Sequence, residues 1–423
     1  MDSVDAEIAA ALANGPADGP PWRALLRRNS LGAILPSTSN TLLILTHDPA
    51  LVDILQFDEF RDEYRLLKPA PGGREFAAPR ALADADEILV QVYLQAAYPG
   101  LDRLPRNAVR DAITTAARRH TVHPVREYLS GLVWDGKPRL DRWLYAAFDA
   151  DGDEQPDYVR AVGTRVPVAA VRRIFHPGCK FDHLMVLEGS QGIGKSAAIR
   201  AMVPDPAWFS DSVHADLTSK DAAAGMAGVW LIEFPEIEHL LRSSSETVKS
   251  FLSRQVDRHR PPYERNTIER PRESILIGTS NRADYGRDDT GNRRLWPIAC
   301  RHADTSWIEL NRDQLWAEAV CQERQGLPIW LDNSDVAAVA TEIQAERMVS
   351  DSWSDQIGSY VRGRLDVRTS DILRECLEKP TGQITRSDQM RVATILRTMG
   401  WVNRRQRSNG EKAMVWTKER VGE

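Results

Sequence analysis

The clearest chemical pattern in the sequence is a short glycine-rich segment that ends in a lysine and a serine. Residues 189–196 read GSQGIGKS, which fits G-x-x-x-x-G-K-[ST], and they follow the apolar residues 183–187. Glycines let backbone N–H groups turn inward around an anion, and a helix beginning at Lys195 would point its positive end at the same place. Lys195 adds a charge, and Ser196 offers a hydroxyl to Mg²⁺.

The segment therefore predicts a loop that binds the phosphates of a nucleotide. The predicted binding residues are Gly189, Ser190, Gln191, Gly192, Ile193, Gly194, Lys195, Ser196 and Ala197. The alternative is a glycine-rich turn between a strand and a helix, with the lysine side chain in solvent.

Two acidic residues follow the next apolar run. Residues 229–232 read VWLI and are followed by Glu233 and Glu236. In Mg²⁺-assisted hydrolysis of a nucleotide, one carboxylate holds the water shell of the metal and another polarises the attacking water. We assign Glu233, with Ser196, mainly to the metal and Glu236 to the water, and the two roles are interchangeable at this level. The alternative is a pair of surface acids at a strand end.

Polar groups after two further segments complete the predicted site. Residues 274–278 read SILIG and lead to Asn281, whose neutral amide suits a hydrogen bond to the terminal phosphate or the attacking water. A turn-forming DDTGN then delivers Arg293 and Arg294, whose guanidinium groups suit the charge that develops on a transferred phosphate. In a ring, a neighbouring subunit could present either arginine. The alternatives are an ordinary turn asparagine and an arginine pair that is solvated or neutralised by the two aspartates of the turn.

Alternating strand and helix patterns surround these residues. The sequence predicts strands at residues 183–187, 229–234 and 274–278, and helices from residue 195 and at 243–253. Because strands that alternate with helices form a largely parallel sheet covered on both faces, we expect an α/β fold.

Helical patterns flank this region on both sides. A helix, a turn and a second helix start are expected within residues 123–143, a helix containing Pro167 at 158–175, and helices within 307–345. Near the beginning of the chain, residues 41–57 favour a short strand followed by a turn and a helix.

The end of the chain is basic and has a different pattern. Residues 361–423 hold 14 Lys and Arg against 8 Asp and Glu, and an apolar helix is followed by two short strands joined by SNGE. A helix followed by a hairpin suggests a winged helix, with Trp401 and Trp416 in its core. Such a module could bind duplex DNA, although a solvated face or a protein contact is the alternative. The basic residues are Arg391, Arg397, Arg404, Arg405, Arg407 and Lys412.

The overall composition limits the class of protein. The 423 residues suggest two or three domains at roughly 150 residues each, and the net charge of −5 by itself predicts no nucleic-acid partner. Four cysteines form no C-x-x-C pair, so neither a zinc site nor a disulfide framework is indicated. Apolar runs are shorter than the roughly 18 residues of a membrane span, and the first thirty residues do not resemble a signal peptide. We expect a cytoplasmic protein without membrane contact.

Several motifs in order resemble the virulence-associated protein E (VapE-type) family. They are LEGSQGIGKS, WLIEFPE, SRQVDRHRPPYE, GTSNRADY, DDTGNRRLWPI and RDQLWAEA, and the resemblance covers about residues 100–335. These proteins are superfamily 3 helicase-like P-loop ATPases of phages, plasmids and pathogenicity islands. The resemblance implies an AAA+-like fold and a hexameric ring that pulls single-stranded DNA through its pore. It also implies the same roles for the loop at 189–196, Glu233 with Glu236, Asn281, and Arg293 or Arg294.

The resemblance further implies a DNA-touching hairpin just before the strand that leads to Asn281. Cations interleaved with an aromatic residue suit a groove that follows phosphates with weak base preference. A contact between subunits or a solvated role is the alternative. The candidates for this pore loop are Arg258, His259, Arg260, Tyr263 and Arg265.

The sequence thus predicts an ATP- and Mg²⁺-dependent DNA helicase or translocase that acts on single-stranded or forked DNA in the replication of a mobile element. The first alternative is a nucleotide-dependent regulatory protein that blocks or recruits phage or host replication proteins, and the second is a small-molecule kinase. The expected organisation is a poorly defined region at 1–100, a helical module at 101–178, a P-loop ATPase domain at 179–345 and a winged-helix-like domain at 346–423.

Overall fold

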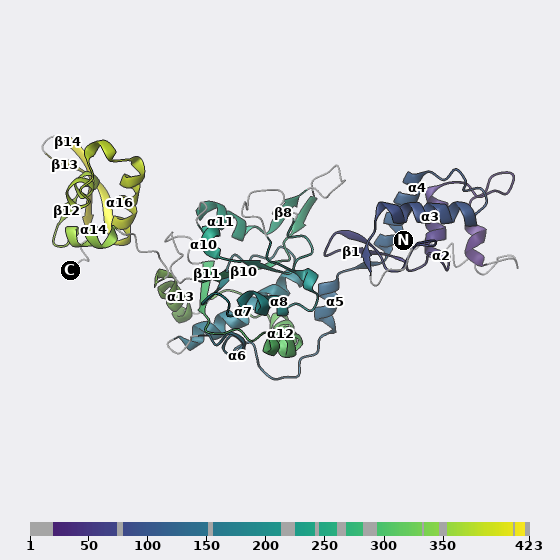
Figure 1. Ribbon diagram of the computed structural model, residues 1–423, viewed down its shortest axis with the longest axis horizontal. Coiled ribbons are helices and arrows are strands. Elements are labelled where there is room, and N and C mark those ends of the chain that lie inside the picture. The colour runs from purple at the N-terminus through teal and green to yellow at the C-terminus, as the bar shows by residue number, and fades with distance from the viewer. Residues whose placement is uncertain are drawn as a thin grey trace.

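The computed structural model describes residues 20–73, 79–150, 155–212, 225–241, 245–259, 268–281, 294–331, 334–346, 353–408 and 411–418. They form an N-terminal, a central and a C-terminal body, and the central body lies between the other two (Figure 1). Across the described residues, none of the helices combines the length and the apolar character needed to cross a membrane.

The N-terminal body is a small mixed sheet covered by helices. Its strand order is β3-β2-β1-β4, in which β1 pairs antiparallel with β2 and parallel with β4. One hydrophobic cluster, from Trp22 to Ala117, joins the sheet to the helices. The elements are β1 (Leu55–Asp58), β2 (Glu63–Leu66), β3 (Arg80–Ala81), β4 (Thr121–Val122), a short 3₁₀ helix (Pro21–Leu25), α2 (Thr38–His47), α3 (Asp84–Ala97) and α4 (Arg106–Arg119).

Two sequence expectations differ from the structure in this body. The short strand expected at the start of residues 41–57 is part of α2 instead, and the strand β1 follows this helix. The Ser37 side chain favours the helix start, because it accepts a hydrogen bond from the Asn40 N–H. The expected boundary at residues 100 and 101 lies inside one packed unit, since Val109 and Ile113 of α4 belong to the same hydrophobic cluster as α2.

The central body is built on a five-stranded sheet in the order β11-β5-β10-β7-β6, and every pairing in it is parallel. The α/β expectation with a parallel sheet is therefore confirmed, as are the three strands predicted from the sequence. The strands are β5 (Leu184–Glu188), β6 (Phe209–Ser210), β7 (Leu231–Phe234), β10 (Ile275–Ser280) and β11 (Leu295–Ala299).

Helices cover both faces of this sheet. One face packs on α7 (Pro156–Phe175), α8 (Lys195–Ala201) and α12 (Thr305–Arg324), and the other packs on α10 (Ile237–Leu241) and α11 (Ser245–Ser253). Helix α13 (Ser334–Glu346) contacts α7 and β11, while α5 (Pro124–Gly131) and α6 (Trp143–Phe148) pack beside α7. The helices expected around 123–143, at 158–175 and within 307–345 are all present.

Alternation along the strands decides which residues face which helices. On β5, Met185 and Leu187 join the cluster on the α8 side, whereas Leu184 and Val186 join the cluster on the α11 side. Both faces are apolar, which explains the continuous apolar runs of the sequence. The same alternation fixes the direction of the polar residues at the strand ends.

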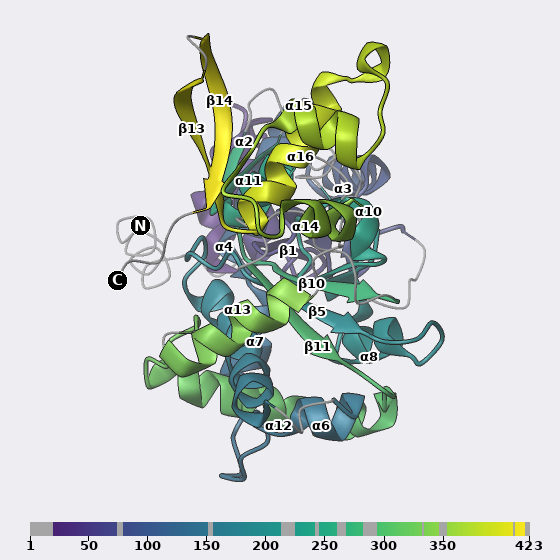
Figure 2. The same cartoon turned by 90° about the vertical axis from the view of Figure 1, so that its left-hand side faces the viewer.

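The C-terminal body consists of short helices and a three-stranded antiparallel sheet in the order β12-β14-β13. Figure 2 shows the β13–β14 hairpin extending beyond α16. Trp401 and Trp416 are buried in its core, as the sequence predicts. The elements are β12 (Asp366–Val367), β13 (Trp401–Ser408), β14 (Glu411–Lys418), α14 (Ser354–Val361), α15 (Thr369–Asp371), a π-helical turn (Ile372–Cys376) and α16 (Arg386–Thr398).

Candidate functional site

The candidate site lies at the carboxyl edge of the central sheet. Strand β10 lies between β5 and β7, so the glycine loop after β5 and the ends of β7 and β10 come together. In open parallel sheets this edge is where ligands bind. The sequence predicts polar residues at each of these three strand ends.

The glycine loop has a backbone shape that other residues would not adopt. Gly192 and Gly194 have φ values of 85° and 96°, in the left-handed region that favours glycine. A Cβ atom on Gly189 would lie 2.4 Å from the carbonyl oxygen of Cys300, the residue that follows β11. This distance excludes a side chain at position 189. The Gly189 N–H donates to the Ser280 carbonyl at 3.1 Å and ties the loop to the end of β10.

Lys195 folds back onto this loop. Its Nζ donates to the Gly189 and Ser190 carbonyls at 2.6 and 3.0 Å, and to Asn281 Oδ1 at 3.3 Å. The side chain is buried, and burial lowers the pKa of its amine. The structure thus joins Lys195 and Asn281, which the sequence assigned to the same site from separate motifs.

Glu233 is fully buried on the α8 side of the sheet, because it alternates with Ile232 and Phe234, which face α11. Its Oε1 accepts from Ser196 Oγ at 2.6 Å and from Thr279 Oγ1 at 2.8 Å. Its Oε2 is also buried and has no hydrogen-bond partner among the described atoms. A buried carboxylate oxygen without a protein partner is costly, so this oxygen suits a cation or a water molecule as its partner.

Two further acidic residues, Glu236 and Glu238, follow the end of β7. Glu236 lies exposed in the turn after β7 with a φ of 48°. Two residues further on, Glu238 on α10 accepts a hydrogen bond from Ser280 Oγ, and its other carboxylate oxygen is buried without a described partner. Sequence reasoning missed both Glu238 and Thr279, although the alternation on β10 was a signal that Thr279 faces Glu233.

The predicted arginine pair is only half described. Arg293 and the two aspartates of its turn lie outside the described residues. Arg294 lies at the amino end of β11, where its Nε donates to Asp182 at 3.1 Å and its Nη2 to Ser253 Oγ at 3.2 Å. Arg294 is therefore neutralised by Asp182, at the sheet edge opposite to the glycine loop.

The segment predicted as a DNA-touching hairpin contains two antiparallel strands, β8 (Val256–His259) and β9 (Ile268–Pro271). Arg258 is exposed and pairs with Glu269 across the hairpin at 2.6 Å. Arg260, Tyr263 and Arg265 fall outside the described residues, as does the side chain of His259. Of the predicted pore-loop residues, the structure thus describes the surroundings of Arg258 alone.

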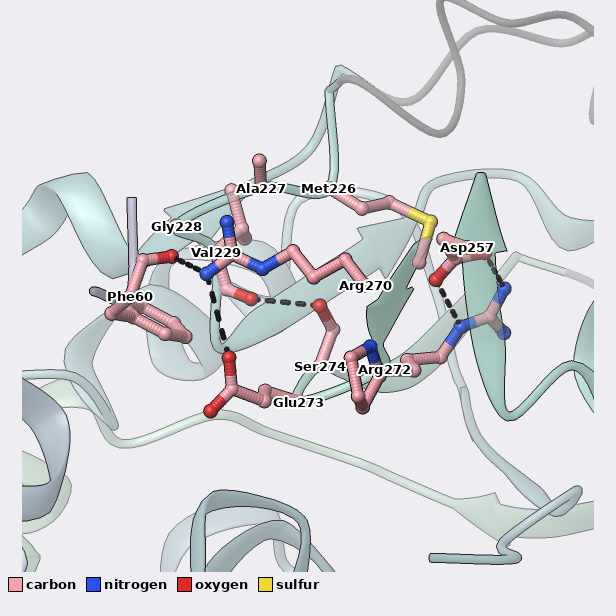
Figure 3. Close-up of a pocket in the computed structure, with 11 residues that line it drawn as sticks. Phe60, Met226, Ala227, Gly228, Val229, Asp257, Arg270, Arg272, Glu273 and Ser274 are labelled. Carbon is pink, nitrogen blue, oxygen red and sulfur yellow. Dashed lines mark hydrogen bonds and ion pairs between the residues drawn. The ribbon is translucent and has the colours of Figure 1, made fainter. Parts of the chain in front are cut away.

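The base of the hairpin is held by buried charges (Figure 3). Arg272 makes two parallel bonds to Asp257 at 2.8 and 2.7 Å, and its Nη1 donates to the Phe251 carbonyl at 2.8 Å. The enclosed space lined by Phe60, Arg270 and Glu273 measures about 20 Å³, enough for about one water molecule. It is therefore a packing gap and not a ligand site.

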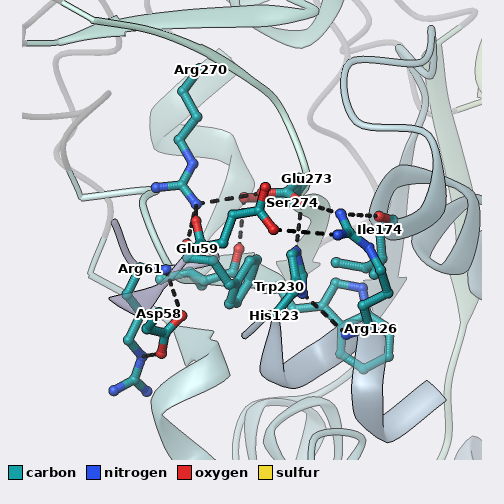
Figure 4. Close-up of polar contacts among 12 residues, drawn as sticks. Asp58, Glu59, Arg61, His123, Arg126, Ile174, Trp230, Arg270, Glu273 and Ser274 are labelled. Carbon is teal, nitrogen blue, oxygen red and sulfur yellow. Dashed lines mark hydrogen bonds and ion pairs between the residues drawn. The ribbon is translucent and has the colours of Figure 1, made fainter. Parts of the chain in front are cut away.

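The same base contacts the N-terminal body (Figure 4). Arg270 donates to the Glu59 and Phe60 carbonyls and lies 3.4 Å from Glu273 Oε2. The other Glu273 oxygen lies 2.8 Å from His123 Nε2. The Phe60 ring is buried in the central hydrophobic cluster, so the turn after β1 anchors one body in the other.

The C-terminal candidates lie on β13. Arg404 is exposed, and Arg405 and Arg407 pair in register with Met414 and Lys412. The side chains of Arg405 and Arg407 lie outside the described part of the chain.

Comparisons with known proteins bear on the central body. A family model described as the virulence-associated protein E-like domain matches residues 129–349. None of the curated proteins matches the chain. Among solved structures, the apo structure of the NrS-1 C-terminal region (305–718) is 11% identical, with a TM-score of 0.46 over 86% of this chain and 96% of that one. Its A-form apo structure is also 11% identical, with a TM-score of 0.46 over 90% and 100%.

The matched segment begins in α5 and ends beyond α13, so it contains the whole parallel sheet and every residue of the candidate site. It covers slightly more than half of the 423 residues. The chain therefore belongs to the virulence-associated protein E-like family.

Proposed function

We propose that this chain is an ATPase that couples ATP hydrolysis to movement along DNA or to its unwinding, in the replication of a phage, plasmid or pathogenicity island. The central body is then a P-loop ATPase domain of the AAA+-like, superfamily 3 helicase type, and the C-terminal body is a winged-helix-like module. One observation carries the proposal: Lys195 with Ser196, Glu233 and Asn281, from three separate segments, meet beside the glycine loop.

In this proposal the chain's own groups bind the phosphates first. Loop N–H groups and the Lys195 ammonium contact the phosphate oxygens, and Lys195 exchanges its bonds to the Gly189 and Ser190 carbonyls for these stronger, charged acceptors. The Asn281 amide, which already contacts Lys195, is positioned to hydrogen-bond the terminal phosphate.

The residues present also fit Mg²⁺. Ser196 Oγ and the Glu233 carboxylate are hard oxygen donors, and Glu233 Oε2 lacks a hydrogen-bond partner within the described structure. Mg²⁺, when bound, neutralises charge on the phosphates. Thr279 holds Glu233 Oε1 in place, so the other oxygen is left for the metal or its water shell.

Two acids are candidates for polarising the attacking water. Glu236 stands next to the exit of β7 and is exposed, as solvent access would require, whereas Glu238 is held by Ser280. We assign the role to Glu236, so Glu236→Gln should reduce turnover more than Glu238→Gln. A greater loss in Glu238→Gln would reverse the assignment.

The proposal includes assembly into a ring of six subunits, because the family resemblance implies it. Arg294 lies at the amino end of a five-residue parallel strand, about 16 Å of chain away from the edge that holds the glycine loop. It therefore cannot reach the nucleotide of its own subunit. If this segment supplies an arginine finger, the finger acts on the nucleotide of a neighbouring subunit.

The test compares ATP turnover and strand separation in one set of purified proteins. Lys195→Ala should lower turnover at least about 100-fold, because it removes a charged group that touches the phosphates. Lys180→Ala is the matched control, since Lys180 is an exposed lysine before β5, at the opposite edge of the sheet. Unchanged turnover in Lys195→Ala would refute the ATP site.

Single-stranded DNA should accelerate turnover, and a forked duplex should be opened only with ATP and Mg²⁺. If ATP turnover does not change when DNA is added and the forked duplex is not opened, the proposed movement along DNA is refuted. That result would favour the nucleotide-dependent regulatory protein, which needs no movement along DNA.

A further inference from the structure

The C-terminal body contains a hollow of about 660 Å³ that is separate from the glycine loop and from strands β8 and β9. It lies where the end of α14 and the turn before β12 meet the start of β13 and the end of β14. The residues that line this α14–β14 hollow are Ser354, Gly358, Ser359, Val361, Arg362, Gly363, Arg364, Met399, Trp401 and Lys418.

The lining of the hollow is positively charged. Its described residues include Arg362, Arg364 and Lys418 and no carboxylate. Within the described residues none of these three cations has an ion pair, whereas Lys379 and Arg374 of the same body are paired with Asp388 and Asp371. Three unneutralised cations around one concave surface create a positive potential that attracts an anion.

The size and the walls of the hollow indicate what kind of anion. Its volume is within the range of about 300–1,000 Å³ that encloses a small organic molecule, so it is larger than a single inorganic ion needs. Met399 and the largely buried Trp401 supply an apolar wall, and Ser354 and Ser359 supply hydroxyls. The occupant should therefore carry both negative charge and flat or apolar surface.

Arg364 is held in a defined position. Its guanidinium lies over the Tyr360 ring at 3.8 Å from the centroid. A guanidinium plane that is supported from one side can stack with a nucleotide base or bind a phosphate on the other. Arg364 can thus contribute with little loss of side-chain freedom on binding.

We propose that the α14–β14 hollow binds nucleotides of an unpaired DNA strand, with the three cations on the phosphates and the apolar wall against a base. A duplex keeps its bases stacked inside and cannot place one in such a hollow, so the site should prefer single strands. These residues are different from the basic residues of α16 and β13 considered for duplex DNA. The proposal depends on the charge and shape of this body and not on the ATP site.

The test measures binding of a fluorescent oligo(dT) strand to the full chain by anisotropy, without nucleotide. The triple variant Arg362→Ala, Arg364→Ala and Lys418→Ala should bind at least about tenfold more weakly. Its slope of log affinity against log salt should fall by about 2, since each lost phosphate contact on a single strand removes about 0.7. Arg374→Ala is the control, because Arg374 is a half-exposed arginine of the same body with a carboxylate partner.

Ultraviolet cross-linking of the same strand provides a second readout that does not depend on the variants folding. Cross-linked peptides should map to residues 353–364 or 399–402. An unchanged affinity and slope in the triple variant, or an equal loss in Arg374→Ala, would overturn the proposal. An equal loss of affinity for a blunt duplex would also overturn it, in favour of a duplex-binding surface. Lys195→Ala should bind the strand normally. A result that refutes the ATP site is therefore distinguishable from a result that refutes strand binding by the α14–β14 hollow.

Discussion

Removing one charge at the base of the hairpin should destabilise the central body strongly. In Asp257→Asn the side chain keeps its shape but leaves Arg272 buried without its carboxylate. The two side chains are 7% and 0% exposed, and Arg272 makes two of its hydrogen bonds to Asp257. Breaking such a buried pair from one side costs about 3–5 kcal/mol, because the remaining charge is desolvated and unpaired.

The same hairpin supplies a matched comparison. Arg258 and Glu269 also pair across β8 and β9, but their side chains are 71% and 60% exposed. An exposed pair contributes about 0.2–1 kcal/mol, so Glu269→Gln should have a small effect. At about 2–4 °C per kcal/mol for a domain of this size, Asp257→Asn should lower Tm by about 6–20 °C, and Glu269→Gln by less than about 4 °C.

Both variants are to be followed by thermal unfolding and by urea unfolding with tryptophan fluorescence as the signal. Replacing Arg272 by Met in the Asp257→Asn background should recover part of the loss, since no buried charge then remains. Equal losses in Asp257→Asn and Glu269→Gln would refute the reasoning. So would a double variant less stable than Asp257→Asn alone.

Three further outcomes follow from single contacts. Gly189→Ala should weaken ATP binding at least about tenfold by calorimetry, because its Cβ would meet the Cys300 carbonyl at 2.4 Å, whereas Gly131→Ala, with open space around it, should not. The Cys300 thiol should resist iodoacetamide at pH 8 and react only after unfolding, because burial raises its pKa to about 12 and little thiolate forms at pH 8. Labelling of Cys300 before unfolding, detected by mass spectrometry, would contradict this. Phe60→Ala should cost about 3–5 kcal/mol of unfolding free energy and speed protease cleavage between the N-terminal and central bodies.

The core of the candidate site could be predicted from sequence because its signals are local. The glycine loop is contiguous, and a strand that precedes it fixes where Lys195 and Ser196 lie. Glu233 and Asn281 each follow an apolar run, and parallel strands bring their carboxyl ends to one edge. The glycine-rich motif and the strand pattern were together sufficient to place these residues at one edge.

The contacts that sequence reasoning missed join distant segments. Nothing in the neighbourhood of His123 indicates that its ring meets Glu273, 150 residues later. Helix α2 was missed for a different reason, because TLLIL is rich in residues that also favour strands. Its buried residues Asn40, Thr41, Ile44 and Leu45 have helical spacing. A local signal for the helix was therefore present, but the strand-favouring composition outweighed it.

The placement of β10 connects the separate parts of the proposed motor. Its first residues follow Arg272 and Glu273, which hold the base of the hairpin and the turn of the N-terminal body. Its last residues are Thr279 and Ser280, which hold Glu233 and Glu238, and Asn281 follows them. Six buried residues, about 20 Å of strand hydrogen-bonded on both sides, thus join the hairpin to the nucleotide site. Buried strands resist bending and shearing. In the proposed motor, a displacement of the hairpin base by DNA must therefore either move Thr279 and Asn281 or break the contacts of Arg272. The proposed coupling should for this reason be most sensitive to changes in the Asp257–Arg272 pair.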